Sequence, residues 1–92
     1  MKDYIYTIDG MDILIEQKSL DKSIEDQGRR LQAYCVRKIR EQAGMERKSF
    51  CEWLGIPYRT LQDWELGQRV MPDYVLRLIA YKVRMEKSAG RI

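Results

Sequence analysis

The segment from Cys51 to Glu65 constrains the fold more than any other part of the chain. It predicts two short helices joined by a tight turn at Gly55, because glycine adopts a positive φ at little cost. The small Cys51 lies four positions before that glycine, and the apolar Leu61 and Trp64 lie six and nine positions after it. This spacing lets two helices cross closely and turns one face of the second helix outward, as in a helix-turn-helix.

The second helix of this pair is predicted to present hydrogen-bonding side chains on its outward face. Such side chains suit contacts with base edges in the major groove of DNA. Many αα-corners share the spacing, so the pattern alone is only moderately specific. The outward residues are Tyr58, Arg59, Gln62 and Asp63.

The rest of the chain after residue 28 is predicted to be helical. A four-residue apolar period indicates a helix from about residue 29 to the residue before Gly44. Further helices are expected at about 46–54, 57–66 and from Pro72 onward, with Pro57 in a first helical turn. In the last helix, apolar residues cover more than one face, which indicates a second contact such as another subunit.

The N-terminal third has a different pattern. Two β-branched and aromatic runs, 4–8 and 11–15, are separated by Asp9-Gly10, which predicts a β-hairpin with a type I′ turn. Since an isolated hairpin is marginal, it either packs on its own domain or pairs with another chain through a strand edge. A short helix is expected around Leu20–Gln27.

Charge divides the chain in the same place. Residues 1–28 hold three lysines and seven carboxylates, a net charge of −4, whereas residues 29–92 hold 14 cations and seven carboxylates, a net charge of +7. A basic domain favours a polyanion through counterion release, although such residues can also simply solvate helix surfaces. A chain of 92 residues makes one domain, here divided into an acidic extension (1–28), a helical domain (29–87) and a frayed tail (88–92).

Several functional classes find no support in the composition. No apolar run approaches the roughly 20 residues that span a bilayer, and no signal-peptide layout opens the chain, so a cytoplasmic protein is expected. Cys35 and Cys51 fall on apolar helical faces and are expected to be buried thiols rather than a disulfide or a metal site. With no histidine and no phosphate-cradling loop, we expect neither catalysis nor a metal or cofactor.

The stretch from Arg40 to Pro72 resembles, without a gap, the lambda-repressor-like (XRE-type) helix-turn-helix family. The segments that carry the resemblance are 40–45, 50–56 and 60–67, followed by Arg69 and Pro72. Residues 60–69 look most like small bacterial and phage regulators, including HigA-like antitoxins. The resemblance implies a mainly α fold, with four to five helices of a lambda-repressor-like domain following the N-terminal hairpin.

The resemblance also implies roles for individual positions. Arg40 and Glu65 match a pair that often forms an internal ion pair, and Cys51 stands where alanine is usual. Asp63 departs from the pattern, since it either accepts from a cytosine amino group or pairs with Arg59 four residues earlier. Pro57 stands where a Ser or Thr N-cap is common. The DNA-binding candidates are Arg47, Lys48, Tyr58, Arg59, Thr60, Gln62, Asp63 and Arg69, and the structural candidates are Arg40, Cys51, Gly55, Leu61, Trp64 and Glu65.

These observations predict a sequence-specific transcriptional regulator, most readily a repressor, that binds double-stranded DNA as a homodimer. One alternative is the antitoxin of a toxin–antitoxin pair, whose acidic N-terminal third holds a toxin protein while the basic part binds DNA and autoregulates the operon. Another is a protein-interaction module that keeps the helix-turn-helix as a scaffold.

Overall fold

The computed structural model describes residues 2–92, and the chain starts with an antiparallel hairpin of β1 (Tyr4–Ile8) and β2 (Met11–Ile15). Ile8 pairs with Met11, so the turn is the two-residue Asp9-Gly10. Both turn residues have positive φ, 50° and 82°, as a type I′ turn requires. The hairpin prediction is therefore confirmed.

The hairpin packs on the helices through one face. Met11, Ile13 and Ile15 alternate inward along β2 and are buried, while Asp12 and Leu14 face outward. This alternation is the period-2 pattern of a strand with one covered face.

A buried tyrosine fixes the end of β2 to α1 (Gln27–Ala43). The Tyr34 hydroxyl donates to the Leu14 carbonyl at 2.7 Å and accepts from the Glu16 amide at 3.1 Å, so its buried oxygen is fully used.

The helix predicted at Leu20–Gln27 is wrong. A 3₁₀ helix over Gln17–Ser19 is followed by turns, because the Asp21 carboxylate accepts from the Ser23 amide and hydroxyl and so stabilises a turn. The pKa of Asp21 is lowered by these same hydrogen bonds. Asp26 then caps α1 by accepting from the Arg29 amide at 2.9 Å, so that helix starts two residues earlier than expected.

Three further helices complete the fold: α2 (Arg47–Leu54), α3 (Tyr58–Glu65) and α4 (Asp73–Ser88). The coarse prediction of a mainly helical domain behind an N-terminal hairpin is confirmed. After α4, the tail that was expected to fray turns back, and Ile92 packs against the core.

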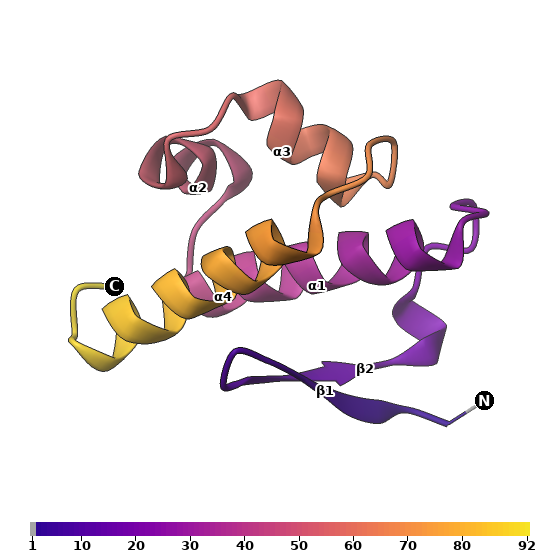
Figure 1. Cartoon of the computed structure of the whole chain (residues 1–92), viewed down its shortest axis with the longest axis horizontal. Coiled ribbons are helices and arrows are strands. Elements are labelled where there is room, and N and C mark those ends of the chain that lie inside the picture. The colour runs from indigo at the N-terminus through magenta and orange to yellow at the C-terminus, as the bar shows by residue number, and fades with distance from the viewer. Residues whose placement is uncertain (1) are drawn as a thin grey trace.

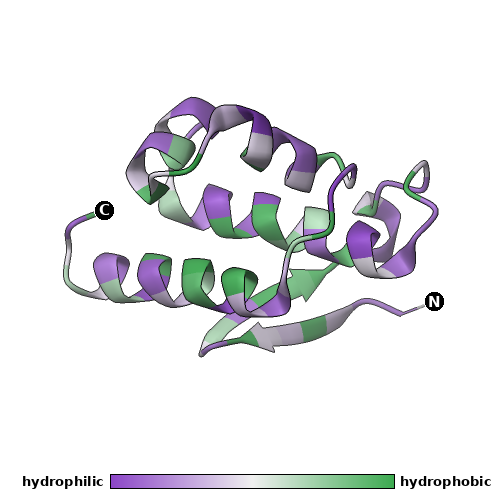
Figure 2. Ribbon diagram, turned by 45° about the horizontal axis from the view of Figure 1, so that its top comes forward, coloured by the Kyte–Doolittle hydropathy of each residue, from purple (hydrophilic) through white to green (hydrophobic). Residues whose placement is uncertain are grey.

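The elements form three layers (Figure 1). α1 and α4 lie side by side in the middle, the hairpin covers one side of them, and α2 and α3 cover the other. In Figure 2 hydrophobic green gathers on β2, α1 and α4, whereas the ribbon of α3 is mostly purple and white. The largest fully buried side chains come from every layer and include Tyr34, Phe50, Ile13, Ile39 and Leu61.

No helix among the described residues is both long and apolar enough to cross a membrane.

Candidate nucleic-acid interface

The turn between α2 and α3 is set by Gly55. Its φ is 74°, and no atom lies within 4 Å of the place a Cβ would take, so the backbone conformation rather than space favours glycine. The amide of Gly55 bonds to the Glu52 carbonyl at 3.2 Å, and the Ile56 amide bonds to the Cys51 carbonyl at 3.0 Å. This left-handed cap ends α2 and redirects the chain into α3.

Pro57 lies just before α3 rather than in its first turn, which corrects the predicted start by one residue. With φ −62° and ψ 142° it is extended, and its carbonyl accepts from the Thr60 and Leu61 amides at 3.1 and 3.2 Å. Its ring offers no side-chain acceptor, so no side chain caps the first amides of α3. The amides of Tyr58 and Arg59 therefore remain available at the positive end of the helix dipole.

The predicted anchors of the motif are all in the core. Leu61 is fully buried, and Cys51 and Trp64 are nearly so. Trp53, on α2, is half-buried and stacks on Phe50 with 6.0 Å between ring centroids. The burial of Cys51, Leu61 and Trp64 fixes how α2 and α3 cross, and this holds the exposed face of α3 in place.

The outward face of α3 carries fewer of the candidates than the sequence predicted. The Arg59 side chain is 80% exposed, the most open of the candidate arginines that make ion pairs, and Tyr58 is exposed as well. Thr60 and Gln62 are half-buried. Lys48, at the start of α2, is exposed.

Asp63 shares that side of α3 with Arg59, four residues earlier, but the prediction that it is open to the outside is wrong. Its side chain is only 12% exposed because two arginines cover it. One carboxylate oxygen accepts from Arg59 Nε at 3.4 Å, and the other lies 3.5 Å from a terminal guanidinium nitrogen of Arg69. Of the two alternatives for Asp63, the pairing with Arg59 is the one present in the structure. The carboxylate orients both arginines and lowers the net charge they present.

A second carboxylate, that of Glu65, is completely buried between two arginines from other helices. Arg40 reaches it from α1 through two hydrogen bonds, of 2.9 and 3.1 Å, so the predicted internal pair is present. Arg47 reaches the Oε1 atom of the same carboxylate from α2 at 3.3 and 3.4 Å. One buried charge therefore ties α1, α2 and α3 together.

Arg47, predicted as a DNA-binding residue, is consequently more enclosed than a side chain that contacts a phosphate would be. Its side chain is 25% exposed, and its guanidinium lies 6.0 Å from the centroid of the Tyr58 ring. Burial lowers the pKa of Arg47, but its contacts with Tyr58 and Glu65 outweigh that effect and raise it. Arg47 positions Tyr58 and the start of α3, and only part of its guanidinium remains open.

The basic surplus of residues 29–92 is not concentrated at the α2–α3 corner. Most of it lies on α1 and α4. Within residues 47–69 the cations Arg47, Lys48, Arg59 and Arg69 are offset by the carboxylates Glu52, Asp63 and Glu65. The corner thus offers a few oriented cations rather than a strongly positive surface.

Three contacts that shape this site have no signature in the sequence. Arg47 shares Glu65 with Arg40, and Arg69 shares Asp63 with Arg59. In addition, the loop after α3 is held by the Gln32 side-chain amide, which donates to the Met71 carbonyl at 2.7 Å and accepts from the Met71 amide at 3.2 Å. The contacting residues lie 18, 6 and 39 positions apart, and each pair joins different elements, so no local helical period reveals these contacts.

Among the described residues, no group of three or more Cys, Asp or Glu side chains could hold a metal ion. Comparisons of the chain with protein-family models, with curated proteins and with solved structures found no match.

Proposed function

We propose that this protein is a sequence-specific DNA-binding regulator with a lambda-repressor-like helix-turn-helix, in which α3 enters the major groove. The observation that carries the proposal is the α2–α3 corner itself. A left-handed turn at Gly55 and the buried Leu61 and Trp64 hold α3 on the surface, with Arg59 projecting from its first turn. This is the arrangement through which recognition helices contact base edges.

Arg59 is the principal base-reading residue in this proposal. A guanidinium can donate two hydrogen bonds to guanine, and Asp63 holds the Nε side of Arg59 while the terminal nitrogens remain free for the base. Tyr58 and Gln62 add hydrogen-bonding groups on the same helix. Lys48 and Arg69 flank α3 and would contact phosphates, which position the protein without reading sequence.

A single α3 reads only a few base pairs, so useful specificity calls for two copies on an inverted repeat. In a two-fold dimer, the recognition helices enter successive major grooves about 34 Å apart. Occupancy of a promoter by such a dimer excludes RNA polymerase, and this is how the proposed regulator represses.

The test starts with selection of bound sites from random DNA, followed by titrations of the selected site. Arg59→Ala should weaken specific binding by about 5- to 150-fold, the range expected from a bidentate contact worth roughly 1–3 kcal/mol. Binding to random DNA should change little. Arg37→Ala is the matched control, because it removes the same charge from a part of α1 that lies beside Ser19 and Tyr34 rather than beside α3. Equal losses for both variants on both DNAs would refute base reading by Arg59.

A second candidate function, an antitoxin, is favoured by the hairpin extension. It is acidic, and Tyr4, Ile5 and Tyr6 remain about half-exposed on it. A basic toxin strand could add to β1 while α3 binds DNA. Co-expression with the product of the adjacent reading frame, followed by purification of a stable stoichiometric complex, would support this alternative, and growth arrest that the protein fails to relieve would exclude it.

A further inference from the structure

The hairpin has one covered edge and one open edge. On β2, the outward-pointing carbonyls of Asp12 and Leu14 accept from side chains of α1, Gln42 at 3.5 Å and Tyr34 at 2.7 Å. Asp12 and Leu14 are paired in register with Thr7 and Ile5 of β1. In an antiparallel ladder such partners both point their backbone groups away from each other, so the groups of Ile5 and Thr7 point out of the open edge.

An apolar stripe on α4 is likewise uncovered. Tyr74, Leu78, Tyr81 and Met85 are between 41% and 61% exposed. Their spacing of four, three and four residues aligns them along one side of a helix. The buried residues of α4, including Ile79 and Val83, lie on the opposite side. The stripe is therefore a second apolar face that the chain itself does not cover.

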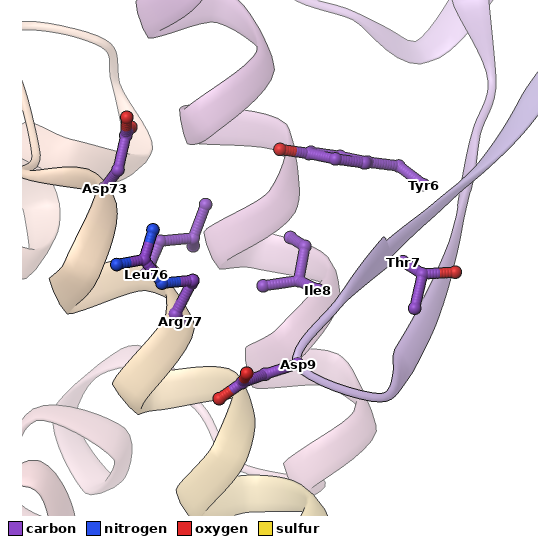
Figure 3. Close-up of a pocket in the computed structure, with 7 residues that line it drawn as sticks. All are labelled: Tyr6, Thr7, Ile8, Asp9, Asp73, Leu76 and Arg77. Atoms are coloured by element: carbon purple, nitrogen blue, oxygen red, sulfur yellow. The ribbon is translucent and has the colours of Figure 1, made fainter.

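The open edge and the stripe lie on the same side of the molecule. β2 packs against both α1 and α4, whereas β1 packs mainly against α4, so the open edge of β1 lies on the α4 side. Between them runs a groove of about 190 Å³ whose lining includes Tyr6, Thr7, Asp9, Leu76 and Arg77. Figure 3 shows Tyr6 and Ile8 pointing from β1 toward α4 across this groove, whereas the Thr7 side chain points away from α4.

We infer that a second copy of this chain docks here, with the two β1 strands pairing antiparallel about a two-fold axis to form a continuous four-stranded sheet. The free backbone groups then dictate the register. Ile5 of each copy faces Thr7 of the other as a hydrogen-bonded pair, and Tyr6 faces Tyr6 on the axis. The helices of the two copies then lie on the same face of this four-stranded sheet, which brings the two α4 stripes together.

The exposed apolar area fits a second copy. The register also brings Asp3 of one copy opposite Asp9 of the other, a like-charge pair that opposes docking. Arg77 lines the same groove as Asp9 and is the cation placed to offset that repulsion. The exposed apolar side chains on the helical face each offer on the order of 100 Å², giving roughly 600 Å² per copy, or about 1,200 Å² in total, the lower bound of a standard interface. They are Tyr4, Tyr6, Tyr74, Leu78, Tyr81 and Met85. Ile5 is left out because, like its strand partner Leu14, it points to the opposite face of the sheet.

The inferred dimer deepens the proposed function, on which its biological meaning rests. With helices packed about 8–10 Å apart, two adjoining α4 helices place the two α1 helices about 24–30 Å apart. α3 packs on α1, on the side away from the sheet (Figure 1). Both recognition helices would therefore lie on one face, at a spacing similar to the ~34 Å between successive major grooves.

The interface is tested without DNA, so that its failure stays separate from failure of the DNA-binding proposal. Sedimentation equilibrium of the full chain should show a monomer–dimer equilibrium. Thr7→Pro removes the outward amide at the edge but no backbone hydrogen bond to β2, and it should raise the dimer dissociation constant at least ten-fold. Thr7→Val is the matched control, because it keeps that amide while also losing the Thr7–Asp12 hydrogen bond, and it should leave the constant unchanged. A monomeric wild type, or equal constants for both variants, would overturn the inference.

A second measurement decides the matter should Thr7→Pro prevent folding. Tyr6→Cys places a thiol at the two-fold axis, within the ~4.5–5.5 Å Cβ separation of directly opposed residues, and should give a covalent dimer on mild oxidation. Leu14 is more exposed than Tyr6, at 48% against 38%, but it lies on the far strand, so Leu14→Cys should remain uncrosslinked. The native Cys35 and Cys51 are buried and do not interfere. Crosslinking at both positions, or at neither, would reject the register.

Discussion

Replacing Arg40 by methionine tests the buried charge cluster that supports α3. The Glu65 side chain is completely buried, and among residues 2–92 Arg40 makes the only hydrogen bond to its Oε2 atom, at 2.9 Å. Arg47 reaches only Oε1, at 3.3 Å or more. In Arg40→Met, one oxygen of a buried carboxylate would therefore lose its partner.

The expected loss of unfolding free energy is about 3 kcal/mol, the lower end of the 3–5 kcal/mol range for breaking a buried pair, because Arg47 still compensates part of the charge. For a domain of this size, that corresponds to a fall in Tm of roughly 12–24 °C. Arg47→Met should cost less, on the order of 1–2 kcal/mol, since both Arg40 bonds remain.

Urea denaturation followed by circular dichroism at constant m-value gives these free energies. Lys38→Met serves as the control, because Lys38 makes an exposed pair with Glu41 and lies 5.5 Å from the centroid of the Tyr34 ring, and losing these weak contacts should cost about 1 kcal/mol or less. Replacing both Arg40 and Glu65 by apolar residues should recover much of the stability lost in Arg40→Met. If Arg40→Met costs no more than Lys38→Met, Glu65 does not depend on Arg40, and the reasoning fails.

Three further outcomes are expected. Asp63→Asn should weaken binding to the selected operator, because the two arginines that the carboxylate orients become mobile. The same change makes the protein one charge more positive, so its binding to random DNA should tighten. The reverse pattern in DNA titrations would contradict this. Gly67→Ala should lower the free energy of unfolding by more than about 2 kcal/mol, because the new Cβ would lie 2.5 Å from Ile24 Cδ1. Gly55→Ala has a similar φ but open space around the new Cβ, so it should cost only about 1 kcal/mol in the same denaturation assay. Burial raises the pKa of the Cys35 thiol to about 12 from 9.0, so above pH 9 the unfolded chain loses a proton that the folded chain keeps. The free energy of unfolding should therefore fall by up to about 1.4 kcal/mol per pH unit relative to that of Cys35→Ala. Parallel plots of unfolding free energy against pH for the two proteins would contradict this.

Local patterns predicted much of the fold. The Asp9-Gly10 hairpin and the helices that end before Gly44 and Gly55 follow from turn chemistry and apolar periods, which act within a few residues. The error at Leu20–Gln27 has a local cause too, because an Asp21 turn outcompeted a weak apolar stripe.

The site was predicted less completely, for a different physical reason. Spacing identified Leu61 and Trp64 as anchors, and the resemblance supplied the Arg40–Glu65 pair. The burial of Asp63 depends on Arg69 reaching back over it from the loop after α3, a contact that no helical period encodes. A helix wheel assigns each residue a direction, but it does not reveal which side chain from elsewhere will cover it.

Glu65 joins three helices through one carboxylate, and this makes independent opening of α3 costly. α2 and α3 have only eight residues each, far below the length at which isolated helices persist in water. Exposing α3 would strand the charges of Arg40 and Arg47 as well as its own apolar face. Backbone amides in both short helices should therefore exchange with deuterium together with those of α1, as one cooperative unit. A DNA-reading helix that cannot fray alone would meet the major groove already shaped, with little ordering entropy left to lose on binding.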